Sequence, residues 1–358
     1  MSRYWSDHVA ALSPYVPGEQ PRQQALLKLN TNEHPHGPSP KALAVLRQAI
    51  GDDLRLYPDP EAKALCAGLA EHHGLTPEQV FVGNGSDEVL AHVFNALFRR
   101  QGRPLLVPDI TYSFYRTYCQ LFDVPAQLIP LADDFSLQAA DYIALGGTPV
   151  AGVIFANPNA PTGISLPLDD VRAIAEAHRD VPVAVDEAYV DFGGESAVAL
   201  LDAHPNVVVV RTFSKSRALA GLRIGYVLAH PDIVDGLRRV KDSFNSYPLD
   251  RLAQAAALAS VEDQAYFEQG CQAVIQTRTR LSAQLSALGF HVLPSSANFV
   301  FASHPAHEGE ALSRALREQG VLVRHFSQPR ISRYLRITVG TSADCDRLIE
   351  VLTRILRA

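Results

Sequence analysis

The chain has 358 residues, more than one hydrophobic core usually supports, so we expect one large domain and a smaller one. Apolar residues make up 47% and charged residues 20%, as in soluble globular proteins, and no run of about 18 apolar residues could span a bilayer. The formal net charge is −6 without a long block of one sign, which argues against nucleic-acid or membrane partners and favours a small-molecule substrate.

The first residues lack the charged start, apolar stretch and cleavage site of a secretory signal, so the cytoplasm is the expected compartment. The cysteines show no Cys-x-x-Cys spacing, which argues against a zinc ribbon, a thioredoxin-type motif or a disulfide scaffold. The 13 histidines show no ligand spacing with Cys or acidic partners, so no metal site is expected.

Up to about residue 230, short apolar runs rich in Val, Ile, Leu and Ala alternate with longer amphipathic stretches. This alternation is typical of buried parallel strands and their crossover helices, so it predicts an α/β fold. Asp87–Arg99 and Leu168–His178 carry apolar residues at helical spacing and acidic residues near their starts, and we expect both to be helices. The expected strands are Val80–Gly83, Leu105–Val107, Val150–Ala156, Val181–Val185, Val207–Val210 and Ile224–Leu228.

From about Pro231 the pattern changes to that of a smaller α+β domain. We expect a long helical stretch through roughly Val261, a second helix around Cys271–Leu288 and a closing helix over Ala343–Arg357. The expected strands between them are Val292–Leu293, Asn298–Phe301, Val321–Arg324 and Leu335–Val339. The start of the chain is rich in Pro and polar residues, so the expected division is an arm (1–28), a large domain (29–240) and a small C-terminal domain (241–358).

Polar residues follow four of the expected strands directly. Ligands of an open parallel sheet bind beyond the carboxyl ends of its strands, so we expect these residues to converge on one cleft. The four segments are Asn84–Asp87, Asn157–Gly163, Asp186–Glu187 and Arg211–Lys215.

Lys215 is the candidate reactive amine. Only five of the 32 basic residues are lysines, and this one follows a run of four valines. A lysine becomes a nucleophile near neutral pH only when burial or a nearby cation lowers its pKa, and a strand end in a cleft offers that burial. The alternative for any lysine is a solvated surface position.

Asp186 is the candidate buried carboxylate, since it follows Val181–Val185. A carboxylate beside a ring nitrogen keeps that nitrogen protonated, which a cofactor acting as an electron sink requires. The Tyr189 hydroxyl could donate a hydrogen bond to the same cofactor. The alternatives for the Asp186-Glu187 pair are a helix N-cap or a metal ligand, and no Gly-x-x-x-x-Gly-Lys-Ser/Thr motif supports the latter.

A phosphate group needs backbone donors, hydroxyls and a fixed cation, best supplied at a helix N-terminus. Gly85-Ser86-Asp87, Ser214 and Arg223 meet this description, although Gly-Ser-Asp alone is often only a helix cap. Tyr112 could lay its ring against a cofactor face, or be an ordinary core aromatic.

Four segments in order, Asn157–Gly163, Asp186–Tyr189, Thr212–Lys215 and Ala220–Arg223, resemble the signature of fold-type I aminotransferases. The resemblance covers almost the entire chain. It implies a large domain with a mostly parallel seven-stranded sheet between helices, a smaller α+β C-terminal domain, and pyridoxal 5′-phosphate bound covalently to Lys215, which is also the general base. In the family, the Asp meets the pyridine nitrogen, the Tyr the phenolate oxygen, and the Ser and Arg the phosphate. The expected cofactor residues are Gly85, Ser86, Asp87, Tyr112, Asp186, Tyr189, Thr212, Ser214, Lys215, Arg223 and Tyr57.

One position departs from this signature. The family commonly has Asn directly before Pro-Thr-Gly, where it contacts the cofactor phenolate oxygen, whereas this chain has Ala160. Asn157 or Asn159 could reach the same region, or Tyr189 could serve alone.

Further segments resemble histidinol-phosphate aminotransferases in particular: Leu12–Tyr15, Lys28–Glu33, Arg55–Pro58, Gly320–Arg324 and Leu335–Gly340. This resemblance implies a homodimer in which Tyr57 reaches the cofactor phosphate of the neighbouring subunit. It also implies that Arg336 binds the carboxylate of the amino donor and that Tyr15 and Arg324 hold the substrate phosphate. Surface ion pairing is the alternative for both arginines.

The implied reaction is transamination between histidinol phosphate and 2-oxoglutarate, giving imidazole-acetol phosphate and glutamate in histidine biosynthesis. Alternatives with the same fold are an aromatic aminotransferase, a threonine-phosphate decarboxylase and a non-catalytic cofactor-binding regulatory module. The chain lacks a Gly-x-Ser-x-Gly elbow, a His-Glu-x-x-His pair and a complete Gly-x-Gly-x-x-Gly motif, which argues against hydrolase, zinc and dinucleotide functions.

Overall fold

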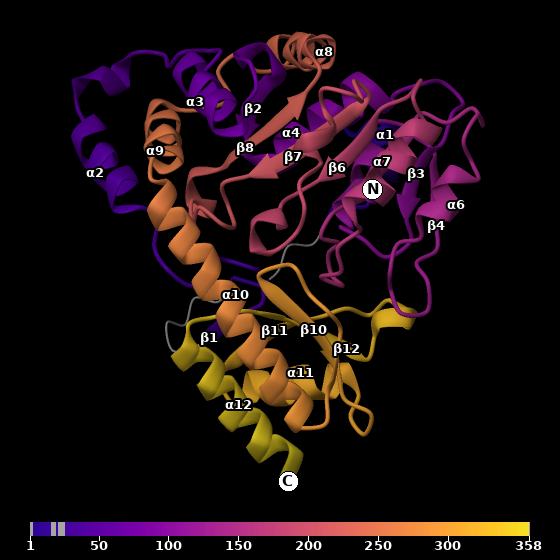
Figure 1. Cartoon of the computed structure of the whole chain (residues 1–358), viewed down its shortest axis with the longest axis vertical. Coiled ribbons are helices and arrows are strands. Elements are labelled where there is room, and N and C mark those ends of the chain that lie inside the picture. Colours follow the sequence, from indigo (N-terminus) through magenta and orange to yellow (C-terminus); the bar gives the residue numbers. More distant parts are fainter. Residues whose placement is uncertain (1–2, 16–18, 21–25, 358) are drawn as a thin grey trace.

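The computed structural model describes residues 3–15, 19–20 and 26–357 and contains two β-sheets, one above the other in Figure 1. The upper sheet has seven strands in the order β2-β8-β7-β6-β5-β3-β4, and only β8 runs against the others. The expected mostly parallel seven-stranded sheet is therefore confirmed. Its strands are β2 (Val80–Asn84), β3 (Leu105–Pro108), β4 (Ala126–Ile129), β5 (Gly152–Ala156), β6 (Val183–Asp186), β7 (Val207–Thr212) and β8 (Ile224–Ala229).

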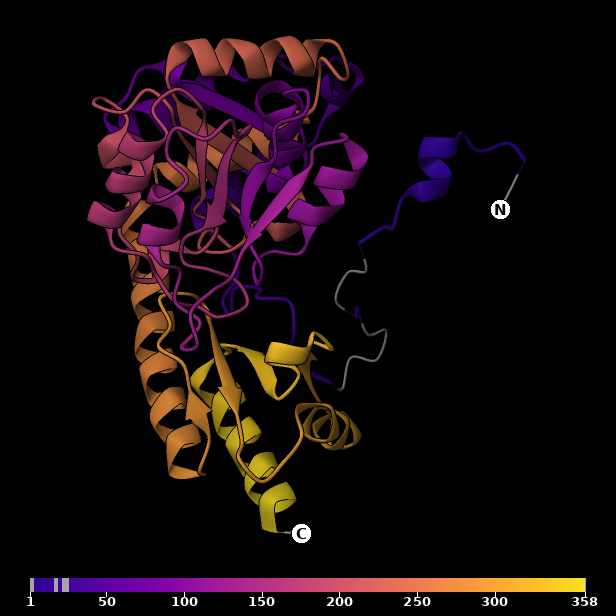
Figure 2. The same ribbon diagram turned by 90° about the vertical axis from the view of Figure 1, so that its right-hand side faces the viewer.

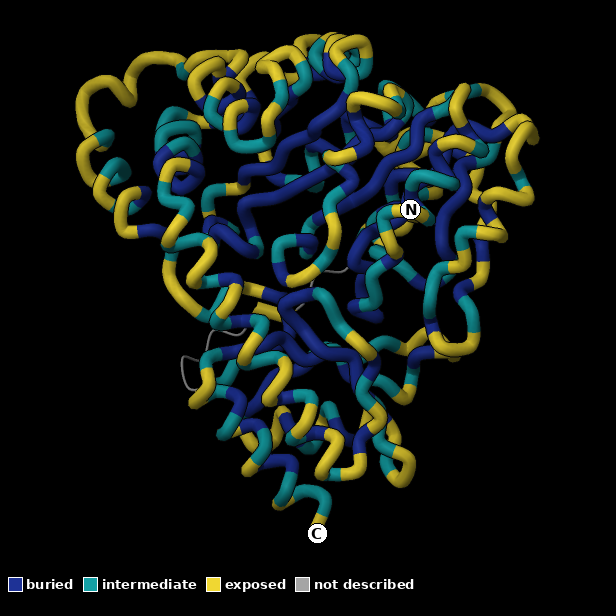
Figure 3. Tube along the Cα trace, viewed as in Figure 1, coloured by how far each residue is buried: buried dark blue, intermediate teal, exposed yellow. Residues whose placement is uncertain are grey.

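Both faces of this sheet are buried, which explains the continuous apolar runs. Val207 and Val209 of β7 belong to one core cluster, whereas Val208 and Val210 belong to a second cluster on the opposite face. In Figure 3 the strands accordingly lie inside a more exposed layer of helices. The helices at this level of the molecule are α2 (Pro40–Ala49), α3 (Lys63–His73), α4 (Gly85–Val93), α5 (Phe114–Leu121), α6 (Ala139–Ile143), α7 (Leu168–Ala177), α8 (Pro231–Asp242) and α9 (Arg251–Val261).

The lower sheet has five strands in the order β1-β11-β12-β10-β9. Its first strand, β1 (Leu27–Leu29), comes from the start of the chain and pairs in parallel with β11. A separate core cluster lies between this sheet and its helices. The remaining elements are β9 (His291–Val292), β10 (Phe299–Ser303), β11 (Val321–His325), β12 (Tyr334–Thr338), α10 (Gln264–Ala287), α11 (Gly309–Glu318) and α12 (Ser342–Arg357).

Two helix predictions differ from the structure. The expected continuous helix to Val261 is wrong, because α8 ends at Asp242 and α9 begins anew behind Asp250, whose side chain accepts a hydrogen bond from the Ala253 amide. Pro248 lies in the break and has no amide hydrogen to continue a helix. The helix expected over Asp87–Arg99 starts at Gly85 and changes to a π-helical turn over Phe94–Phe98.

The long helix α10 spans both levels of the molecule (Figure 1). The helix before it, α9, packs against α2 and α3 beside the upper sheet, whereas α10 contacts β9, β10 and α12 below. Chain contacts thus cross the division expected at residue 240, and that division stays a prediction. Within the described part of the chain, no helix combines the length and apolar character needed to cross a bilayer.

The beginning of the chain runs along the outside of the molecule. Figure 2 shows the short helix α1 (Asp7–Ala11) standing to one side of the two sheets. Further on, the Tyr15 ring lies 4.7 Å from that of Phe114 at the start of α5, measured between centroids. This contact brings Tyr15 to the region where the carboxyl ends of the central strands open.

Candidate active site

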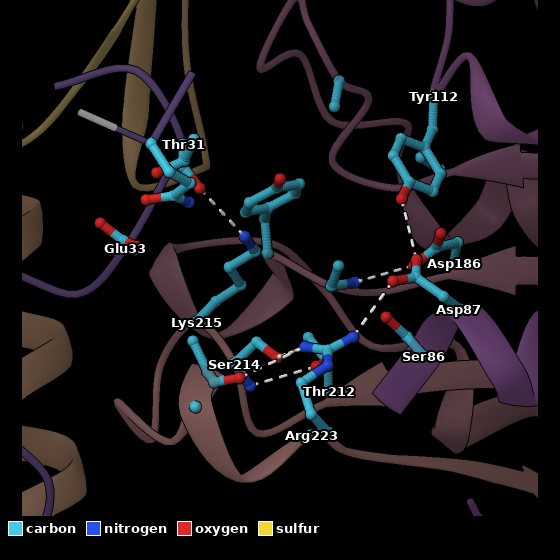
Figure 4. Close-up of a pocket in the computed structure, with 17 residues that line it drawn as sticks. Thr31, Glu33, Ser86, Asp87, Tyr112, Asp186, Thr212, Ser214, Lys215 and Arg223 are labelled. Carbon is cyan, nitrogen blue, oxygen red and sulfur yellow. Dashed lines mark hydrogen bonds and ion pairs between the residues drawn. The ribbon is translucent and has the colours of Figure 1, made fainter. Parts of the chain in front are cut away.

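The carboxyl ends of β2, β5, β6 and β7 surround one cavity of about 420 Å³ (Figure 4). The four polar segments expected at these strand ends therefore do converge. Residues that the sequence predicted and that line this cavity are Ser86, Asp87, Tyr112, Asp186, Tyr189, Thr212, Ser214, Lys215 and Arg223. Gly85 lies just outside, where a side chain would collide with the Arg223 guanidinium.

Asp186 is the last residue of β6, and its side chain is almost completely buried. Its carboxylate accepts hydrogen bonds from the Tyr115 hydroxyl, at 2.7 Å, and from the Ala188 amide, at 3.2 Å. Burial raises the pKa of Asp186 to about 6, although both hydrogen bonds act in the opposite direction. Within the described part of the chain, no ion pair to this carboxylate offsets the cost of its burial.

Lys215 differs from the other lysines in having no carboxylate within 4.0 Å among the described residues. Its Nζ donates a hydrogen bond to the Thr31 carbonyl oxygen at 3.3 Å and lies 5.8 Å from the centroid of the Tyr189 ring. The other four lysines all pair with carboxylates: Lys28 with Glu33, Lys41 with Asp263, Lys63 with Glu61 and Lys241 with Asp242.

The end of the cavity nearest α4 can hold an anion. Ser86 and Asp87 lie in the first turn of α4, where free amide groups favour negative charge. The Arg223 guanidinium lies 3.1 Å from the Asp87 carboxylate and donates a longer bond, 3.4 Å, to the Ser214 hydroxyl. Gly225 permits this packing, because a Cβ there would come within 2.4 Å of the Ser86 nitrogen.

A second cavity, of about 210 Å³, adjoins the first, and Lys215 lines both. Arg324 and Arg336 line it from opposite positions on β11 and β12. Neither has a carboxylate within 4.0 Å in the described part of the chain, and each guanidinium carbon lies 5.6 Å from the Phe326 ring centroid. Desolvation lowers the pKa of Arg336, whose Nε has no hydrogen-bond partner. Tyr15 completes this wall.

Tyr57 lies elsewhere. Its side chain is 78% exposed, it lines neither cavity, and its ring stacks on that of Tyr247 with centroids 4.6 Å apart. Within one chain, Tyr57 thus takes no part in the site.

Among the residues of the site that were not found from the sequence are Tyr115, Thr31 and Asn32. Tyr115 is a fully buried aromatic in an amphipathic helix, so nothing distinguished it from a core residue. Thr31 and Asn32 line the second cavity and belong to Lys28–Glu33, a segment noted only for its resemblance to a family. Their position depends on how β1 pairs with β11, which local sequence does not encode.

Comparison with known proteins identifies the family. The sequence matches the aminotransferase class I and II family over residues 24–352. The chain belongs to this family. Among similar aminotransferases, it is 59% identical over 355 residues to histidinol-phosphate aminotransferase 1 of Bordetella parapertussis, covering 99% of both chains. It is also 59% identical over 352 residues to histidinol-phosphate aminotransferase 2 of Thiobacillus denitrificans, covering 98% of this chain and 97% of that one.

A solved aminotransferase has the same fold. The crystal structure of histidinol-phosphate aminotransferase from Sinorhizobium meliloti in complex with pyridoxal-5′-phosphate matches with a TM-score of 0.88 and 28% identity. The match covers 100% of this chain and 98% of that chain. Both levels of resemblance inferred from the sequence motifs are thereby confirmed.

The buried carboxylate of this aminotransferase predicts a pH-dependent stability. Folded Asp186 keeps its proton up to about pH 6, whereas the unfolded chain releases it near the ordinary value of 3.8. Without ligand, stability should therefore fall as pH rises through this window and then level off. Asp186→Asn lacks this pH-dependent loss, so its free energy of unfolding relative to the parent should rise by roughly 2 kcal/mol between pH 4 and 6. Urea unfolding measures this difference, and a difference independent of pH would contradict it.

Proposed function

We propose that this chain catalyses the pyridoxal-phosphate-dependent transamination of histidinol phosphate with 2-oxoglutarate, giving imidazole-acetol phosphate and glutamate in histidine biosynthesis. The observation that carries the proposal is the position of Lys215 between two cavities. One cavity has a buried carboxylate and an anion site, and the other has two arginines without carboxylate partners among the described residues. The names of the similar proteins from Bordetella and Thiobacillus support the same substrate.

The first cavity fits pyridoxal phosphate in size and in polarity. About 420 Å³ is within the range of small-molecule sites. The Asp186 carboxylate, costly to bury without a cation, would accept a hydrogen bond from the protonated pyridine nitrogen and keep that nitrogen cationic. Ser86, Ser214 and Arg223 would hold the phosphate at the start of α4. When bound, the cofactor supplies an electron sink for the substrate carbon.

Lys215 would hold the cofactor covalently and then, once released, move the proton at the substrate Cα. No carboxylate lies within 4.0 Å of its Nζ among the described residues, so no ion pair would have to break before the amine meets a ligand. Lys215 lines both cavities and would therefore reach both the cofactor and the substrate. The Tyr112 ring lines both cavities and would cover one face of the cofactor.

The second cavity would bind the substrates through its cations. Arg336 would take the carboxylate of the amino donor, and Arg324 with Tyr15 would take the substrate phosphate. A guanidinium suits both tasks, because it donates two parallel hydrogen bonds and keeps its charge. Both arginines stand on strands of one sheet, so their spacing is held by backbone pairing between β11 and β12.

We further propose a homodimer in which Tyr57 completes the phosphate site of the neighbouring subunit. Tyr57 stands on the surface among other exposed apolar side chains, which a second copy of the chain would cover. The exposed residues near it in sequence, or near its stacking partner Tyr247, are Ile50, Leu54, Leu56 and Phe244. The proposed compartment is the cytoplasm, which four free and buried cysteines fit.

Lys215 can be tested directly. The loaded protein should show the visible absorption of a lysine-linked cofactor, and histidinol phosphate should bleach it. Lys215→Ala should lose both the band and the activity. Lys41→Ala, which removes an exposed lysine paired with Asp263, serves as the control and should keep the band.

Reduction with borohydride and peptide mapping should then find the cofactor on Lys215. A tag on another lysine, or none, would refute the proposal. Turnover of phenylalanine or threonine phosphate in preference to histidinol phosphate would keep the cofactor but change the substrate, and binding without any turnover would indicate a regulatory module.

Substitutions of Arg324 and Arg336 should each impair the reaction of a different substrate. Arg324→Gln should lower kcat/KM for histidinol phosphate about 10- to 100-fold, because a charge-assisted bond to phosphate is lost, and should spare glutamate. Arg336→Gln should lower kcat/KM for glutamate by a similar factor and affect histidinol phosphate less, since histidinol phosphate has no carboxylate. Each variant is the control for the other in steady-state assays, and equal losses for both substrates would contradict the assignment.

Tyr57→Phe tests the shared site. The protein should have twice the chain mass in light scattering with or without the substitution. Cofactor affinity, measured by fluorescence titration, should fall about tenfold because one hydroxyl bond to phosphate is lost. Tyr247→Phe changes the other ring of the stacked pair and should leave the affinity unchanged. A monomeric parent, or equal affinities in all three proteins, would argue against a shared site.

A further inference from the structure

The replacement of the family asparagine by Ala160 leaves the cavity one hydrogen-bond donor short. Ala160 lines both cavities and packs in a small apolar cluster with Phe299 and Tyr189. Its methyl side chain cannot donate to a cofactor oxygen. Another residue must compensate, or Tyr189 must act without help.

The two neighbouring asparagines do not compensate. The side-chain NH₂ group of Asn157 donates to the Leu166 carbonyl at 3.0 Å, and its side-chain oxygen accepts from the Leu166 backbone amide at 2.9 Å. The Asn159 oxygen accepts from Thr111 at 2.9 Å, and its NH₂ group donates to the Ile110 carbonyl at 3.0 Å. Both side chains are buried, and their hydrogen bonds hold the loop after β5 to itself and to the segment after β3. The question left open by the sequence is thus answered against both.

Asn32, from the segment between β1 and α2, reaches the site instead. Its side-chain nitrogen lies 3.0 Å from the Tyr189 hydroxyl oxygen, and the residue is only 1% exposed. Its backbone oxygen accepts a hydrogen bond from Asn298 at 2.9 Å. Asn32 adopts a left-handed conformation with φ 56°, which asparagine tolerates better than most residues. The amide is therefore held firmly against Tyr189.

Thr338 fixes the direction of every hydrogen bond in this chain of groups. Its hydroxyl oxygen accepts from the Asn32 backbone amide at 2.9 Å, so the hydroxyl hydrogen remains to be donated to the Asn32 side-chain oxygen at 3.1 Å. That oxygen must then face Thr338, and the NH₂ group must face Tyr189. The reverse orientation would leave the buried Thr338 hydrogen without its acceptor.

The Tyr189 oxygen consequently accepts a hydrogen bond from Asn32, and its own hydrogen is free to point into the cavity that it lines. A hydroxyl that accepts a hydrogen bond donates a stronger one. Asn32 thus acts on the cavity through Tyr189 without needing to touch a ligand at this point.

We propose that Asn32 and Thr338 are positioning residues that direct the Tyr189 hydroxyl toward the cofactor phenolate oxygen and so compensate for the asparagine that Ala160 replaces. The inference rests on the proposed function, because that oxygen belongs to pyridoxal phosphate. A hydrogen bond donated to the phenolate stabilises its negative charge, which lowers the proton affinity of the lysine–cofactor linkage.

A pH titration of the visible absorbance of the loaded enzyme tests this inference. Tyr189→Phe removes the donor and should raise the pKa of the linkage by about one to two units. Asn32→Ala weakens the donor and should raise it by about half a unit. In the Tyr189→Phe background, Asn32→Ala should add nothing, since its effect passes through that hydroxyl. An undiminished effect in the double variant, or none in either single variant, would overturn the inference.

Thr338 lines neither of the two cavities, and it allows a matched pair of substitutions. Thr338→Ser keeps the hydroxyl and should leave the titration unchanged, whereas Thr338→Val removes it and should raise the pKa in the same direction as Asn32→Ala. Equal titrations of the Ser and Val variants would overturn the inference while leaving the proposed function intact. A parent protein without the lysine-linked absorption would overturn both.

Discussion

The structure depends most on the burial of one carboxylate. Asp186 ends a central strand of the upper sheet, and removing its charge from water is costly unless a cation accompanies it. Tyr115 and the Ala188 amide orient the carboxylate without neutralising it. The fold thus keeps a group whose charge a cationic ligand would stabilise, and the other polar side chains of the site line the same cavity.

The cations of the site complement this carboxylate. Lys215, Arg324 and Arg336 line the connected cavities without carboxylate partners among the described residues, whereas every other lysine is paired. Unpaired charges of this kind reduce the stability of a folded chain, so they are retained where a ligand supplies the missing partner. The fold keeps these cations apart, because the two arginines stand on strands of the lower sheet and Lys215 stands on a loop of the upper sheet.

A network of ion pairs and hydrogen bonds joins the residue that follows Asp186 in the sequence to the residue that follows Lys215. The network thereby fixes the positions of these two site residues. Glu187, next to Asp186, accepts one hydrogen bond from Arg211 at 3.1 Å, and the Arg211 guanidinium also lies 3.3 Å from the Asp191 carboxylate. Asp191 in turn accepts from Ser216, the residue after Lys215, at 2.5 Å. Removal of one member would leave the others buried and uncompensated, so the network favours a single arrangement of both strand ends.

The sequence by itself determined the α/β class and the central strands, because buried parallel strands have a continuous apolar pattern. It also predicted that Lys215 and Asp186 would share one cleft, because polar residues at the ends of such strands are conspicuous. The break at Pro248 was overlooked, because apolar residues on either side kept a helical spacing. Tertiary structure alone decided the remainder. Thr31 and Asn32 reach the site only because β1 pairs with β11, and Thr338 meets Asn32 across 306 residues of sequence. Hydrogen bonds between such distant segments depend on how two sheets are placed, and no local pattern of residues records that placement.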